Sequence, residues 1–143
     1  MILFPLKNGS RHPVHREILA AQSDFFEGLF TFTSFEDKKE FNITTPNIHP
    51  YLTEENFKLV LDTFYEIEHD FDEEKALEMI VLGNYFLAPY LTKKSIVILI
   101  NQMDREGDVG HLWEFAQRYQ LEELKTAIIG YLKNMAEYGR FLK

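Results

Sequence analysis

The sequence contains no cysteine, which excludes disulfides, thiolate zinc sites and a cysteine nucleophile. Long apolar runs are also missing. The longest, Met79–Leu82 and Ile96–Ile100, fall far short of the about 20 residues that a membrane-spanning helix needs. The first residues lack the layout of a signal peptide. We therefore expect an intracellular protein, in the cytoplasm or nucleus, that has no membrane partner.

Positive charge is scarce. The 143 residues include 15 Lys and Arg against 23 Asp and Glu, which gives a formal net charge of −8. A protein that binds the phosphate backbone needs clustered Lys and Arg, so we exclude nucleic acid as a partner. The hydrophobic content of 45% and the aromatic content of 15% predict one folded domain with a substantial core, and a small appendage.

Sequence motifs of catalysis and metal binding are absent as well. There is neither a GxSxG elbow nor a GxxxxGK[ST] phosphate loop, and no two histidines have the i, i+4 spacing of a helical zinc pair. A calcium loop starting at Asp104 fails, because Val109 and Phe115 stand where Gly and Glu are required. His69 lies in a stretch that is typical of a solvated acidic turn. We predict a protein that is not an enzyme and has no cofactor or metal site.

The segment 13–30 reads PVHREILAAQSDFFEGLF, and its apolar residues are mostly three or four positions apart. Ser23 interrupts the pattern, and serine is a poor residue inside a helix but a good N-cap. We predict two short helices, His15–Gln22 and Asp24–Phe30, packed as an apolar hairpin that the rest of the chain must cover. His15 opens the first helix, where a structural hydrogen bond is expected.

Short strands are predicted around this helical pair. Ile2–Leu6 and Ser10–Val14 flank Asn8-Gly9, a dipeptide that suits the type I′ turn of a β-hairpin. Lys39–Thr44 alternates apolar and polar residues and predicts a third strand. Tyr65–Phe71 fits either a short strand or an extended loop. The sheet is therefore expected to be small.

Further helices are indicated by capping residues and periodicity. Thr53 is a good N-cap for a helix that ends at Phe64, and Asp72 can cap the next helix, Glu73–Leu87. A helix from about Leu91 to Met103 should follow, although its IVILI run also fits a buried strand.

The clearest boundary in the chain is the run DREGDVG, residues 104–110. Beyond it, two apolar stripes predict a helical hairpin broken near Gln120. The stripes are Leu112, Phe115, Ala116 and Tyr119, then Leu121, Leu124, Ile128, Leu132 and Met135. The tail, Tyr138–Lys143, is expected to fray.

The segment 13–30 closely resembles the signature of the BTB/POZ family, in which a V-H pair precedes an L-A-A helix, S-x-F-F and a second helix. The matching residues are Val14, His15, Ile18, Leu19, Ala20, Ala21, Ser23, Phe25, Phe26 and Phe30. Later segments resemble the family in the same order. LTEENFKLVLDTFY is similar to its third helix, ALEMIVLGNYFLAPYL to its fourth, and HLWEFAQRYQLEELKTAIIGYL to the first helix pair after the core in BTB–BACK proteins. The likeness spans roughly Ile2–Met135.

The sequence also departs from the family pattern. The helix and strand that many BTB dimers exchange ahead of the first hairpin are missing, so we expect a weaker dimer or a monomer. The usual Y-T-G is Tyr65-Glu66-Ile67, the usual Ala-Ala pair of the fourth helix is Leu82-Gly83, and the loop Thr44–Leu52 is longer than usual.

The resemblance implies two partner surfaces. Family members that bind cullins often carry a hydrophobic-x-Glu motif after the second helix, where this chain reads FTFTSFED. The residues implied there are Phe32, Phe35, Glu36 and Asp37; alternatively, one Phe plugs the core and the acids are solvated. The first predicted helix lies where BTB dimers meet, and the residues implied for a homodimer are His15, Glu17, Ile18 and Ala21.

The expected fold is α+β and BTB/POZ-like: mostly helical, with a small sheet and a C-terminal helical hairpin. Residues 1–103 would form the core, and residues 104–143 a BACK-like extension. The expected function is a non-enzymatic interaction module, an adaptor that binds a cullin scaffold of a ubiquitin ligase. The alternative is a self-associating scaffold, or a transcription-regulatory BTB protein without a ligase role.

Overall fold

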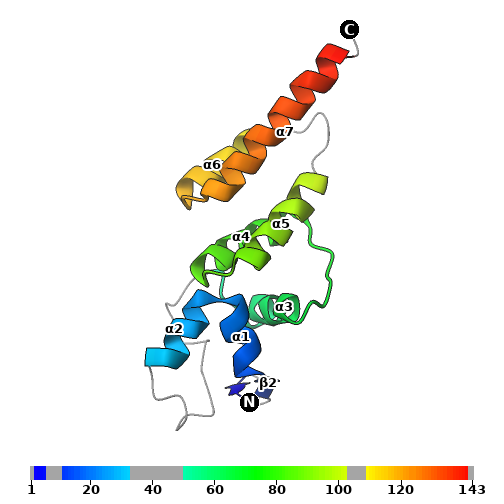
Figure 1. The fold of residues 1–143 in the computed structure, drawn as a ribbon. Coiled ribbons are helices and arrows are strands. Elements are labelled where there is room, and N and C mark those ends of the chain that lie inside the picture. Colours follow the sequence, from blue (N-terminus) through cyan, green and yellow to red (C-terminus); the bar gives the residue numbers. More distant parts are fainter. Residues whose placement is uncertain (1, 6–10, 33–49, 103–108, 142–143) are drawn as a thin grey trace.

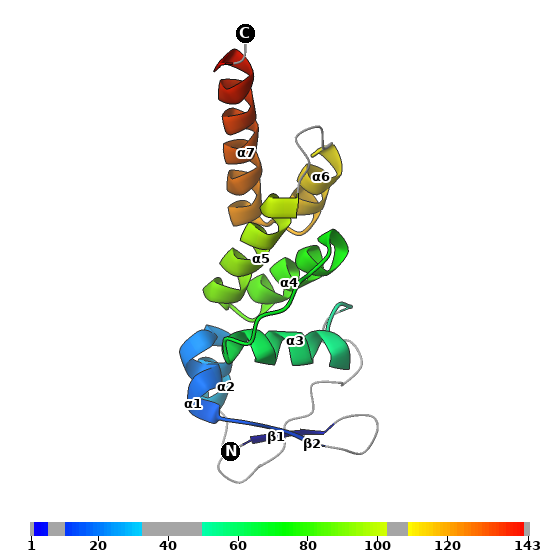
Figure 2. The same ribbon diagram turned by 90° about the vertical axis from the view of Figure 1, so that its right-hand side faces the viewer.

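Figure 1 shows the computed structural model of the chain, which describes residues 2–5, 11–32, 50–102 and 109–141. Two short strands, β1 (Ile2–Pro5) and β2 (Arg11–Val14), lie below the third helix in Figure 2. They pair antiparallel, with Ile2 opposite Val14 and Pro5 opposite Arg11. The predicted turn at Asn8-Gly9 and the predicted strand Lys39–Thr44 lie outside the described residues.

The helical pair that follows breaks at the predicted serine. Helix α1 (Arg16–Gln22) ends at Ser23, and α2 (Asp24–Phe32) begins immediately after it. The chain folds back at this point, so that α1 and α2 pack against each other (Figure 1). The second helix is two residues longer than predicted.

Helices α3 (Glu54–Phe64) and α4 (Glu73–Tyr85) begin at the predicted capping residues. Thr53 accepts a hydrogen bond from the Asn56 amide at 3.1 Å, and Asp72 accepts one from the Lys75 amide at 2.7 Å. Both caps satisfy amides that have no partner inside their own helix. The segment between these two helices is a turn and an extended loop, not a strand.

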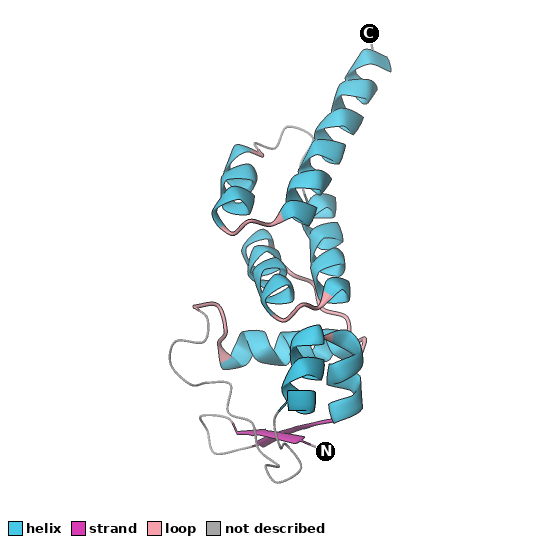
Figure 3. Ribbon diagram, turned by 60° about the vertical axis from the view of Figure 1, so that its left-hand side comes forward, coloured by secondary structure: helices cyan, strands magenta, loops and turns pink. Residues whose placement is uncertain are grey.

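Helix α5 (Pro89–Gln102) packs along α4 and is helical throughout its IVILI run. Pro89 is its first residue, a position where the missing amide costs nothing. Figure 3 shows α4 and α5 as a layer of two helices between the α1–α3 end of the molecule and the C-terminal helices.

The C-terminal helices are α6 (Gly110–Arg118) and α7 (Glu122–Phe141). The backbone is helical as far as Phe141, although the tail from Tyr138 was expected to fray. Leu132, a member of the second apolar stripe, is 46% exposed, because the end of α7 extends beyond the helices that it packs against (Figure 2).

The core is one continuous cluster of buried side chains from Val14 to Ile128. Phe26 lies near its centre, with its ring stacked on Phe86 and on Phe30 at centroid separations of 5.3 and 5.8 Å. Leu112, Leu121 and Leu124 join the same cluster from the C-terminal helices. Burial of these side chains therefore holds α6 and α7 against the preceding helices.

Candidate partner-binding surface

The residues predicted to bind a partner lie at the end of α2 and just beyond it. Phe32 is the last residue of α2, while Phe35, Glu36 and Asp37 fall outside the described residues. The structure thus places only the backbone of Phe32, and the binding role of all four residues stays a prediction.

Helix α1, the predicted dimer contact, has a solvent-facing side and a core-facing side. Glu17 and Ala21 are exposed, whereas Ile18 is half-buried and packs against the core. The His15 amide donates to the Tyr65 hydroxyl at 2.7 Å, and His15 Nδ1 lies 2.9 Å from the same oxygen. The expected structural hydrogen bond is confirmed, and the dimer role of these residues stays a prediction.

A groove of about 390 Å³ lies between the α4–α5 turn and the α6–α7 turn. Buried apolar side chains, Ile80, Leu121 and Leu124, contribute to its lining. Three exposed acids also line it: Asp24 at the start of α2, and Glu122 and Glu123 at the start of α7. The groove thus offers an apolar contact beside negative charge.

Two helix ends shape this groove. The Ala88 amide donates to the Gly83 carbonyl at 2.8 Å, and the Leu121 amide donates to the Ala116 carbonyl at 2.8 Å. These are the long-range bonds of Schellman motifs, in which one residue takes the left-handed conformation. Leu87 (φ 49°) and Gln120 (φ 55°) occupy that position. Neither position is a glycine, the residue that usually signals this motif.

The start of α2 is fastened to the α4–α5 turn beside the groove. The Ser23 hydroxyl donates to the Phe86 carbonyl at 2.5 Å and accepts from the Phe26 amide at 3.2 Å. The Asp24 amide donates to the Leu87 carbonyl at 3.2 Å. The first amides of α2, which have no partner inside their own helix, therefore donate hydrogen bonds to carbonyls at the end of α4. This junction fixes Asp24 at the groove.

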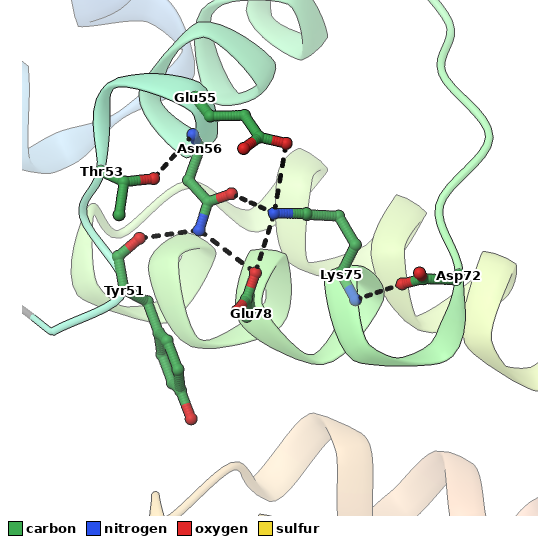
Figure 4. A network of polar contacts seen from close by, with 7 residues as sticks. All are labelled: Tyr51, Thr53, Glu55, Asn56, Asp72, Lys75 and Glu78. Carbon is green, nitrogen blue, oxygen red and sulfur yellow. Dashed lines mark hydrogen bonds and ion pairs between the residues drawn. The ribbon is translucent and has the colours of Figure 1, made fainter.

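A polar network joins α3 to α4 (Figure 4). Its centre is Asn56, which is 2% exposed. The Asn56 amide group donates to the Tyr51 carbonyl at 2.8 Å and to the Glu78 carboxylate at 3.2 Å, while Lys75 donates to Asn56 Oδ1 at 2.6 Å. Lys75 Nζ also lies 3.1 Å from Glu78 and 3.8 Å from Glu55. The network fixes the residues that lead into α3.

Tyr51 extends this network to the C-terminal helices. Its hydroxyl lies 3.2 Å from that of Tyr119, the residue after α6. The hydrogen bond with Tyr119, together with burial, raises the pKa of Tyr51 to about 12. His111 of α6 makes a second polar contact, with Glu73 at the start of α4. Polar contacts therefore add to the apolar packing that holds α6 against the preceding helices. Neither was predicted, because the partners are distant in sequence.

The negative charge of the chain is concentrated in one segment. Between Glu54 and Glu78 there are ten acidic residues and two lysines, so this segment has a net charge of −8. That value equals the formal net charge of the whole chain. The rest of the sequence has equal numbers of acidic and basic residues. The segment covers α3, the loop after it and the first half of α4, so this part of the molecule carries the negative field.

Within the described residues, no group of three or more His, Asp or Glu is arranged to hold a metal ion. None of the helices in the described ranges combines the length and apolar character needed to cross a membrane.

Comparison with known proteins identifies the fold. The family model described as "BTB/POZ domain" matches residues 2–103. The chain is 24% identical over 138 residues to a protein from Xenopus tropicalis named "Kelch repeat and BTB domain-containing protein 8", an alignment that covers 96% of this chain and 22% of that protein. It is 25% identical over 133 residues to a protein of the same name from Danio rerio, covering 92% and 21%. The chain therefore spans about a fifth of the length of these curated relatives.

The chain belongs to the BTB/POZ domain family, since the family model covers well over half of it.

Proposed function

We propose that this BTB/POZ chain is the interaction module of an adaptor that binds a cullin scaffold of a ubiquitin ligase. BTB/POZ membership over residues 2–103 is the observation that carries the proposal. Two distant relatives are named as proteins with kelch repeats and a BTB domain, which is consistent with an adaptor that joins one partner to another. In this proposal the chain has no catalytic role of its own.

The placement of α2 supports one extended partner surface. Its first residue, Asp24, lines the groove, and its last residue, Phe32, begins the predicted partner loop. A nine-residue helix is about 13 Å long, so a single protein domain can reach both ends. The predicted binding residues and the groove would then belong to one interface of ordinary size.

The chemistry of the groove indicates what the partner should present. Apolar side chains such as Ile80, Leu121 and Leu124 suit an apolar anchor residue, because buried anchors contribute most of the affinity of such contacts. The acids Asp24, Glu122 and Glu123 suit basic residues beside that anchor, through complementary charge.

Isothermal titration calorimetry of the whole chain against isolated cullin N-terminal domains tests the proposal. We expect saturable binding to at least one of them, and an affinity at least about tenfold lower for Phe35→Ala, as for an anchor residue. Ile129→Ala is the matched control, since Ile129 is an exposed apolar residue on α7 and does not line the groove. No binding at tens of micromolar would overturn the proposal.

The alternative is a scaffold that self-associates through α1, or acts in transcription, without a ligase role. The observation in its favour is the exposure of Glu17 and Ala21 on one side of α1. Light scattering over a concentration series tests the α1 contact. A dimer that Ala21→Glu dissociates supports the alternative, and a dimer that the substitution leaves intact contradicts it.

A further inference from the structure

Tyr51 is held at both of its ends, by partners from distant parts of the chain. Its backbone carbonyl accepts a hydrogen bond from the side-chain amide of Asn56 at 2.8 Å. Its hydroxyl lies 3.2 Å from the hydroxyl of Tyr119, and the centres of the two rings are 5.9 Å apart. Figure 4 shows the Tyr51 ring pointing away from Asn56. One residue therefore connects the segment before α3 to the residue that follows α6.

The partner at the backbone end of Tyr51 is fixed in place. Asn56 is 2% exposed, and its side-chain amide has two donor hydrogens and one acceptor oxygen. The two hydrogens bond the Tyr51 carbonyl and the Glu78 carboxylate, and the oxygen accepts from Lys75. The backbone amide of the same residue donates to Thr53. A buried amide with all its groups paired cannot turn without losing hydrogen bonds, so it fixes the backbone of Tyr51.

The partner at the hydroxyl end belongs to the turn that forms one wall of the groove. The Tyr119 ring packs on Phe115, with the ring centres 4.7 Å apart. The next residue takes the left-handed conformation, and the Leu121 amide closes the turn by donating to the Ala116 carbonyl. Residues 120–124, which directly follow Tyr119, all line the groove. A displacement of Tyr119 would therefore move this wall.

We propose that Tyr51 positions the α6–α7 wall of the groove, because it transmits the fixed position of Asn56 to Tyr119. Burial of Leu121 and Leu124 also holds this wall, but the hydrophobic effect has no preferred direction. A hydrogen bond between two hydroxyls is directional, so it restricts where the turn can lie. The inference concerns the groove itself and applies to any occupant, so it goes beyond the proposed cullin adaptor.

Amide hydrogen exchange of the isotope-labelled whole chain, followed by NMR with no partner present, tests the proposal. The Ala88 amide is the internal reference, because it makes the same kind of bond, to Gly83, in the opposite wall of the groove. We expect Tyr51→Phe to raise the ratio of the Leu121 rate to the Ala88 rate about three- to tenfold, since the turn opens more often without the hydrogen bond. Tyr90→Phe removes a tyrosine hydroxyl from α5, and as the matched control it should leave the ratio unchanged.

Combined substitutions test the route from Asn56 through Tyr51. Tyr119→Phe should raise the ratio as much as Tyr51→Phe, and the two together should raise it no further, because they remove the same hydrogen bond. Asn56→Asp keeps an oxygen for Lys75 but cannot donate to the Tyr51 carbonyl, so it should also raise the ratio. In a chain that already carries Tyr51→Phe, Asn56→Asp should add less than about twofold, because its route to the turn is already broken.

Two results would overturn the proposal. One is a ratio that Tyr51→Phe leaves unchanged while the Leu121 rate also stays the same, which would show that apolar packing alone holds the wall. The other is an equal rise of the Leu121 and Ala88 rates, which would show that Tyr51 stabilises the whole fold without positioning the wall. Neither result bears on cullin binding, which calorimetry measures separately.

Discussion

At the scale of single residues, one glycine determines how closely α4 and α5 approach. A Cβ atom added at Gly83 would lie 2.4 Å from Thr92 Oγ1 and 2.9 Å from the Thr92 backbone nitrogen. The second contact cannot be relieved by a side-chain rotation. The glycine that departs from the usual Ala-Ala pair of the family is therefore explained by the packing of this pair of helices.

Gly83→Ala should lower the free energy of unfolding by about 1–3 kcal/mol, because the two helices must move apart. Gly130→Ala is the control: Gly130 also lies in a helix, but an added Cβ would meet nothing within 4 Å. That substitution should be neutral or stabilise by up to about 1 kcal/mol. Urea denaturation followed by circular dichroism measures both. Equal effects of the two substitutions would contradict the packing account.

Replacing either of two buried serines by alanine should change the stability in opposite ways. Ser23 makes two hydrogen bonds at the start of α2, whereas the Ser95 hydroxyl has no partner among the described residues. Ser23→Ala should cost about 1–2 kcal/mol of stability, and Ser95→Ala should cost nothing or stabilise. Thermal unfolding of the two variants compares them directly. The interpretation fails if Ser95→Ala is the more damaging substitution.

The Tyr51–Tyr119 contact predicts a pH dependence. The pKa of Tyr51 is raised from its ordinary value of 10 to about 12, so the folded protein keeps a proton that the unfolded chain loses between these values. Stability from this contact is therefore complete below about pH 10 and decreases as the pH rises toward about 12. Between about pH 9 and about pH 11, the denaturation midpoint of the Tyr51→Phe variant should therefore fall less than that of the wild-type chain. An unchanged slope would contradict the assignment.

At the scale of elements, three helices end in the same way without glycine. Glu66, Leu87 and Gln120 all have positive φ angles, and each precedes an amide that donates to a carbonyl five residues earlier. For a non-glycine residue this conformation costs roughly 1–2 kcal/mol. The helix ends are therefore held by the packing around them rather than by local preference.

Gln120→Gly should raise the free energy of unfolding by up to about 1 kcal/mol, because glycine adopts this conformation without steric cost. Gln117→Gly is the matched control: Gln117 is an exposed glutamine inside α6, where glycine should destabilise by up to about 1 kcal/mol. Chemical denaturation distinguishes these opposite signs. A loss of stability in Gln120→Gly would show that the side chain matters more than the backbone.

Caps and periodicity predicted most helices of the described chain, and packing explains the exceptions. Thr53, Asp72 and Ser23 marked three helix starts, because capping depends on residues only two or three positions apart. The exposure of Leu132 could not be read from its helical spacing, since it depends on where the neighbouring helices end. The groove was missed for a similar reason: its acids are separated by nearly a hundred residues and converge only in the fold.

At the scale of the whole molecule, acidic charge and apolar surface meet at the groove between the α4–α5 and α6–α7 turns. The C-terminal helices share one buried core with the preceding helices, and this packing brings together the two turns that form the groove. Its apolar lining and three acids suit a partner segment that presents an apolar residue beside basic ones.

Binding at the groove can be measured by calorimetric titration of a cullin N-terminal domain into the wild-type chain and into the Glu122→Lys/Glu123→Lys variant. We expect saturable binding to the wild type that weakens as salt is added, and at least about tenfold weaker binding to the variant. Glu114→Lys, an exposed acid on α6 that does not line the groove, should bind like the wild type. Absence of wild-type binding at tens of micromolar, or equal binding by all three chains, would contradict the account.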